Sequence, residues 1–164
     1  MRIIGLDPGT ASFGYGVIEK ITPTQRGKNP LHMVTYGCIH TPSKTPLQNR
    51  LLTIYNELAE IIAKEKPNGL AIEKLYFVKN ITTGIAVSQA RGMALLLAAQ
   101  NSLQFFEYDP TQIKLAVAGY GKADKQQVQK MVKLQLQLKE IPKPDDAADA
   151  LAVALSSFIL QNMH

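Results

Sequence analysis

The hydrophobic pattern of this chain changes its period near residue 45, and that change restricts the possible fold more than any other feature. Before it, three apolar segments joined by short links predict an antiparallel meander of strands at residues 2–7, 13–20 and 31–41. After it, apolar residues recur every three or four positions between Leu47 and Ile62. This spacing predicts an amphipathic helix that ends near Pro67.

The rest of the chain alternates between short apolar segments and longer periodic ones. We expect strands and helices at residues 69–74 (strand), 81–100 (helix), 104–108 (strand), about 110–118, 124–138 and 146–164 (all helices). The order βββ-α-β-α-β-α-α-α predicts an α/β fold with a mixed five-stranded sheet and helices on both faces. The 164 residues predict a single domain, residues 1–164, because two units would each be short of core.

The composition indicates where such a chain works. No apolar run reaches the roughly 18 residues that a membrane-spanning helix needs, and the first 20 residues contain Asp7, Glu19 and glycine-centred turns, unlike a signal peptide. The single cysteine, Cys38, suits a reducing compartment, and we expect it to be a buried residue of its strand. These features predict a cytoplasmic protein without membrane association.

The charge of the chain favours a polyanionic partner, and its distribution is more informative than the net value of +5. Residues 145–164 hold three acidic residues and no Lys or Arg, so residues 1–144 carry 18 basic against 10 acidic residues. A basic body with a concentrated acidic spot is what a metal site beneath a phosphate backbone requires. The alternative interpretation is ordinary surface charge together with acidic residues at the start of a helix, which explains the same numbers of acidic and basic residues.

Two carboxylates end apolar strands. Asp7 lies directly before Pro8-Gly9, at the strand edge where open α/β sheets place their sites, although a turn-capping aspartate explains the sequence equally well. Glu73 ends the strand predicted at residues 69–74 and is expensive to bury without a partner, so it is either exposed or binds something. The two acids together favour a shared site.

Three further acids, Asp145, Asp146 and Asp149, open the last helix. Acids in a first turn interact favourably with the helix dipole, which is the simpler interpretation. Asp146 and Asp149 are three residues apart and share a face, so they repel each other unless a cation or donors lie between them. Asp145 follows Pro144, and we expect it to be the N-cap, with its carboxylate turned back to free backbone N–H groups.

Four carboxylates from three segments can form a hard oxygen site: Asp7, Glu73, Asp146 and Asp149. Such a site suits Mg²⁺, or Mn²⁺ in its place, rather than Zn²⁺, which prefers His or Cys. Two metal ions held in this way can activate a water molecule and stabilise the leaving oxygen of an in-line phosphoryl transfer. The pattern therefore indicates metal-dependent chemistry at a phosphate.

Four motifs resemble the RuvC family of Holliday junction resolvases, in family order over nearly the whole chain: Gly5–Gly9, Ala71–Glu73, Ser88–Gly92 and Asp146–Ala152. The resemblance implies an RNase H-like fold and a homodimer. It also implies Mg²⁺-dependent endonuclease activity that nicks two opposed strands of four-way junction DNA in recombination and repair. The family pattern adds a branch-migration complex, RuvA and RuvB, as partner.

The resemblance also implies roles for individual residues. The acidic ligands of the family match Asp7, Glu73, Asp146 and Asp149. Its two basic residues near the scissile phosphate match Lys114 and Lys125. An aromatic after the second acid, phenylalanine in other members, matches Tyr76, and Phe77 adjoins it.

The residues themselves support these roles only in part. Lys114 and Lys125 flank the Gly119–Gly121 loop, where the backbone can approach a phosphate, and Lys122 lies between them. Exposed lysines on amphipathic helices are the simpler interpretation. Tyr76 can stack on an unpaired base, and core packing is the alternative.

Two other classes of protein share part of this pattern. An actin-like or sugar-kinase ATPase fragment shares the strand-Asp-turn opening but needs a second glycine-rich phosphate loop and an adenosine site, which this sequence lacks. A junction-binding module without catalysis does not need four intact carboxylates.

The predicted helix at residues 81–100 is apolar on more than one face, so we expect it to form part of a dimer interface or else to be fully buried.

Overall fold

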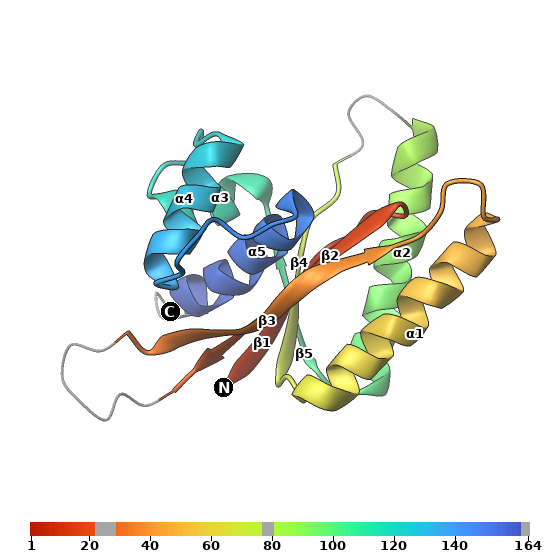
Figure 1. The fold of residues 1–164 in the computed structure, drawn as a ribbon, viewed down its shortest axis with the longest axis horizontal. Coiled ribbons are helices and arrows are strands. Elements are labelled where there is room, and N and C mark those ends of the chain that lie inside the picture. The colour runs from red at the N-terminus through yellow and green to blue at the C-terminus, as the bar shows by residue number, and fades with distance from the viewer. Residues whose placement is uncertain (22–28, 77–80, 162–164) are drawn as a thin grey trace.

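The computed structural model describes residues 1–21, 29–76 and 81–161, which fold around a five-stranded sheet (Figure 1). In the order in which they lie side by side, the strands are β3 (Leu31–His40), β2 (Ser12–Lys20), β1 (Arg2–Asp7), β4 (Gly69–Glu73) and β5 (Gln104–Tyr108). β1, β2 and β3 pair antiparallel, whereas β4 pairs parallel with both β1 and β5. The predicted mixed sheet is confirmed.

Helices cover both faces of this sheet (Figure 1). One face packs against α1 (Leu47–Glu65) and α2 (Ile81–Gln100), and the other against α3 (Pro110–Ala118), α4 (Lys125–Gln135) and α5 (Asp145–Gln161). The predicted order of elements is confirmed, with small differences at the ends. α4 stops at Gln135 rather than residue 138, because Leu136 is its C-cap and Gln137 has a positive φ of 53°. Residues 22–28, between the second and third predicted strands, lie outside the described residues.

The central strand β1 contributes to a hydrophobic core on each face. Ile4 and Leu6 are fully buried beneath α1 and α2, whereas Ile3 is buried in the core formed with α5. A strand buried on both faces has a continuous apolar sequence, which is why residues 3–6 lack polar alternation.

The face of the sheet toward α5 carries very small side chains where the helix crosses β1 and β2. A methyl group added at Gly5 would lie 2.9 Å from the Cβ of Ala154, and one added at Gly14 would lie 2.6 Å from the carbonyl carbon of Asp146. Contacts this short do not occur in folded proteins, so only glycine permits the observed approach. Residues 147, 148 and 150–158 of α5 are buried in return.

Strand β3 forms one edge of the sheet, and its side chains are less covered than the sequence predicts. Cys38 is half-buried rather than buried, because β3 has a neighbouring strand on one side only. Among the described residues, no helix combines the length and the apolar composition needed to cross a membrane.

We predict that Gly14→Ala lowers the free energy of unfolding by about 2–3 kcal/mol, because overpacking of this size forces backbone movement. The added methyl group pushes against the backbone of Asp146. Urea unfolding followed by circular dichroism measures the change. Ala11→Ser, which adds one atom at an exposed position of the preceding turn, is the control and should be neutral. Equal stability of Gly14→Ala and wild type would show that α5 can withdraw from the sheet without penalty.

Candidate active site

Two of the predicted site residues meet because neighbouring strands end at the same level. Leu6 of β1 pairs with Ile72 of β4 in parallel register, so the next residue of each strand, Asp7 and Glu73, lies at the same edge of the sheet. Odd-numbered residues of both strands face α5, as Ile3 and Ala71 in its core show. The two carboxylates therefore lie on the side of the sheet that α5 covers.

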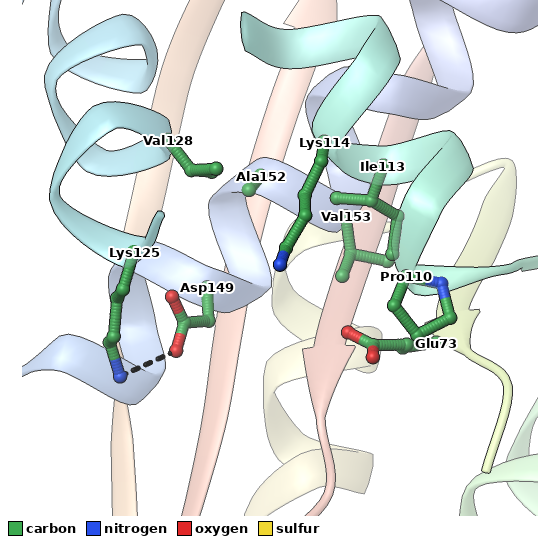
Figure 2. Close-up of a pocket in the computed structure, with 9 residues that line it drawn as sticks. All are labelled: Glu73, Pro110, Ile113, Lys114, Lys125, Val128, Asp149, Ala152 and Val153. Carbon is green, nitrogen blue, oxygen red and sulfur yellow. Dashed lines mark ion pairs between the residues drawn. The ribbon is translucent and has the colours of Figure 1, made fainter. Parts of the chain in front are cut away.

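The first turns of α5 add two more carboxylates. One carboxylate oxygen from each of Asp7, Asp146 and Asp149 can be chosen so that all three lie within 4.8 Å of one another, and all three side chains are half-buried. Glu73 does not belong to this close group. It lies across a cavity of about 270 Å³ from Asp149 (Figure 2).

Lys114 and Lys125 also line this cavity. The side chain of Lys114, from α3, extends into the space between Asp149 and Glu73 (Figure 2). The Nζ atom of Lys125, at the start of α4, lies 2.8 Å from Oδ2 of Asp149. The floor of the cavity is apolar and consists of Pro110, Ile113, Val128, Ala152 and Val153. The site therefore combines charged walls with a low-dielectric floor, where charges interact strongly.

The carboxylates repel one another in this environment. Burial, followed by the charges of Asp149, Asp146 and Glu73, raises the pKa of Asp7 from 3.8 to about 7, although Lys125 opposes the shift. Burial and then Asp149 raise the pKa of Glu73, and burial also raises that of Asp149 despite its hydrogen bond from Lys125. Such a cluster must be neutralised by protons, by ammonium groups or by a bound cation. Clustered carboxylate oxygens fit a hard divalent cation such as Mg²⁺.

The prediction that Asp145 is the N-cap of α5 is wrong. The helix begins at Asp145 itself, and the carbonyl oxygen of Pro144 accepts the first bonds from the N–H groups of Ala147 and Ala148. The carboxylate of Asp145 instead binds Lys143, with Nζ at 2.8 Å from Oδ1, and lies 3.7 Å from Nζ of Lys125. The pair with Lys125 joins segments that are distant in sequence, whereas Lys143 is only two residues before Asp145. The spacing of the acids gave no signal for either pair.

Tyr76 and Lys122 lie outside the cavity. Tyr76 is 61% exposed, and its hydroxyl donates a hydrogen bond to the carboxylate of Asp109, which also pairs with Lys74 at 3.4 Å. Core packing of Tyr76 is therefore excluded. Lys122 is exposed in the link between α3 and α4, and Phe77 lies outside the described residues.

Comparisons with known proteins agree in one family. The model of the family "Crossover junction endodeoxyribonuclease RuvC" matches residues 3–157. The RuvC of Desulfitobacterium hafniense (strain DSM 10664 / DCB-2) is 54% identical over 155 residues, 94% of this chain and 90% of that protein. The structure of Thermus thermophilus RuvC in complex with Holliday junction substrate superposes with a TM-score of 0.89 at 31% identity, over 99% of this chain and 96% of that one.

We predict that the metal-free protein becomes less stable as pH rises from about 4 to about 7. The pKa of Asp7 is higher in the folded state than its unfolded value of 3.8, so ionisation opposes folding, and the stability present below pH 3.8 is lost as pH approaches 7. The interval from 3.8 to about 7 corresponds to about 4 kcal/mol, of which roughly 2–3 kcal/mol is lost between pH 5 and pH 8.

Urea unfolding at pH 5 and pH 8 in EDTA measures this loss. Asp7→Asn should reduce it strongly, whereas Glu60→Gln, which alters an exposed carboxylate of α1, should leave it unchanged. The same loss in Asp7→Asn as in wild type would contradict the assignment of this pH dependence to Asp7.

Proposed function

Because the chain belongs to the RuvC family of crossover junction endodeoxyribonucleases, we propose that it resolves four-way (Holliday) DNA junctions by nicking two opposed strands in recombination and repair. One observation supports the chemistry of this proposal. The carboxylates of Asp7, Asp146 and Asp149 converge at one edge of the sheet, next to a cavity that presents Lys114 and Lys125. Acids that bind metal beside bases that bind phosphate are the parts that phosphodiester hydrolysis needs.

We infer that Asp7, Asp146 and Asp149 hold Mg²⁺, with Mn²⁺ as a substitute, and that Glu73 completes a site for two ions from the opposite wall. When bound, the metal supplies Lewis-acid activation of water and of the scissile phosphate. In this proposal the four carboxylates fix the position of the metal. The raised pKa values of Asp7, Glu73 and Asp149 show carboxylates that are unfavourable without a counter-charge, which supports binding of a cation here.

The basic and aromatic residues act on the DNA in this proposal. Lys114 lies where its ammonium group can bind a non-bridging oxygen of the scissile phosphate as charge develops there (Figure 2). Lys122, which is exposed in the link between α3 and α4, contacts the DNA backbone. The exposed ring of Tyr76 stacks on an unpaired base at the junction.

The two alternative functions are less well supported. An ATPase fragment would not carry a RuvC pattern over residues 3–157. A junction-binding module without catalysis would not require three carboxylate oxygens within 4.8 Å, because this arrangement opposes both folding and binding of a polyanion unless a cation is present.

A homodimer is part of the proposal, since a four-way junction offers two equivalent strands to a two-fold enzyme. Helix α2 supports it with an exposed stripe at helical spacing: Ile85, Gln89, Gly92, Leu96 and Ala99. Ile85 and Leu96 are 52% and 53% exposed, and Gly92 between them lets a second helix approach closely.

We further propose RuvA and RuvB as partners in the cytoplasm, where the chromosomal substrate would be found.

We predict that Asp7→Asn abolishes nicking but retains binding of a four-way junction. Loss of a direct ligand should reduce the rate by more than the roughly 10- to 100-fold that loss of an outer-shell residue costs. Phosphate contacts of Lys and Arg supply most of the affinity, and removal of one negative charge should strengthen it slightly. Single-turnover nicking of a synthetic junction with Mg²⁺ and a mobility-shift titration measure the two effects.

The matched control is Asp124→Asn, which alters the exposed N-cap of α4 to another good capping residue. It should keep both activities. If folded Asp7→Asn loses junction binding together with nicking, the proposed division between metal ligands and DNA contacts is wrong.

We predict that Leu96→Glu converts a dimer into a monomer, because burial of an unpaired carboxylate in an apolar interface is unfavourable. Analytical ultracentrifugation at micromolar concentration measures the molecular mass. Leu52→Glu places the same charge on α1, at a leucine that is 57% exposed, and should remain dimeric. A wild-type monomer, or dimers of both variants, would count against α2 as the interface.

A further inference from the structure

Lys125 lies between two carboxylates of α5 that have different surroundings. Its Nζ atom is 2.8 Å from Oδ2 of Asp149 and 3.7 Å from Oδ2 of Asp145. The two aspartates are four residues apart, one turn of the helix, so their side chains project from the same face. Asp149 belongs to the group of three converging carboxylates, whereas Asp145 does not.

The other oxygen of Asp145 is bound independently. Its Oδ1 accepts a hydrogen bond from Nζ of Lys143 at 2.8 Å, so each oxygen of this carboxylate faces a different lysine. The carboxylate of Asp145 is thereby oriented with Oδ2 toward Lys125. About half of each partner is exposed, 49% of the Lys125 side chain and 46% of that of Asp145, so Lys125 is free to move over a short distance.

A divalent cation and Lys125 compete for the same carboxylate of Asp149. An ammonium group 2.8 Å from that carboxylate partly neutralises it, and a bound cation at the same oxygens would repel the ammonium group. Within the described part of the chain, Asp145 is the other carboxylate that pairs with Lys125. The Nζ atom of Lys125 is already 3.7 Å from Oδ2 of Asp145, so transfer needs a displacement of only about 1 Å to reach hydrogen-bond distance.

We propose that Asp145 is a positioning residue that accepts Lys125 when Asp149 binds a cation, and that it thereby holds the ammonium group at the rim of the cavity, within reach of a DNA phosphate. This inference rests on the proposed function, because it takes Asp149 as a metal ligand. Without Asp145, Lys125 has Asp149 as its carboxylate partner and competes more strongly with the cation.

Binding of Mn²⁺ to the DNA-free protein tests this inference by isothermal titration calorimetry. Asp145→Asn should weaken Mn²⁺ binding by about two- to fivefold, the range expected for an exposed ion pair. In a Lys125→Met background the same substitution should have almost no effect, because no ammonium group remains to be accepted. Asp145→Glu should restore the affinity. A double-mutant cycle of this kind isolates the coupling between the two residues.

Single-turnover nicking at saturating Mn²⁺ supplies a second measurement. Asp145→Asn should lower the cleavage rate of bound junction several-fold with an unchanged dissociation constant for the junction, and Asp145→Glu should recover the rate. Equal weakening of Mn²⁺ binding with and without Lys125 would show that Asp145 acts only through its own charge and would overturn the inference. Wild-type protein that binds no Mn²⁺ would overturn the proposed metal site itself, and with it this inference.

Discussion

The close contact between α5 and the strands β1 and β2 determines where the acidic groups of this protein lie. The helix brings Asp146 and Asp149 to a sheet that already carries Asp7, and it can do so only because Gly5 and Gly14 leave no side chain beneath it. A helix packed over larger residues lies farther from the sheet and would separate these carboxylates by more than a metal ion can bridge. The packing of α5 on the sheet therefore determines the geometry of the site.

The same contact explains the electrostatics. Burial of α5 removes water from around Asp7 and Asp149, and burial is the first cause of the raised pKa of each. Lys114 and Lys125 belong to α3 and α4 rather than to α5, so the compensating positive charge comes from separate elements, and Lys125 pairs directly with Asp149 (Figure 2). The acids and the bases of the site are therefore coupled through an ion pair between two elements rather than within one helix.

Much of this arrangement could be predicted from the sequence, and the rest could not for physical reasons. The strand ends at Asp7 and Glu73 were predictable because apolar runs and turn residues are local signals, and parallel pairing then places the two at one edge. The N-cap assigned to Asp145 was wrong because a local preference was overridden by ion pairs with Lys125, which is distant in sequence, and with Lys143, which lies two residues before Asp145. Separation of Glu73 from the close group depends on side-chain length and cavity width, which no sequence pattern encodes.

The pairing of β1 with β4 has a consequence for how such a chain can change over evolutionary time. Side chains alternate across a strand, so insertion of a single residue into β1 or β4 would turn its terminal acid toward α1 and α2, inside an apolar core. The number of residues in β1 and in β4 thus decides which face of the sheet the terminal acid points to. Changes in the length of β1 or β4 therefore keep the acid on the side of α5 only when residues are added or removed in steps of two.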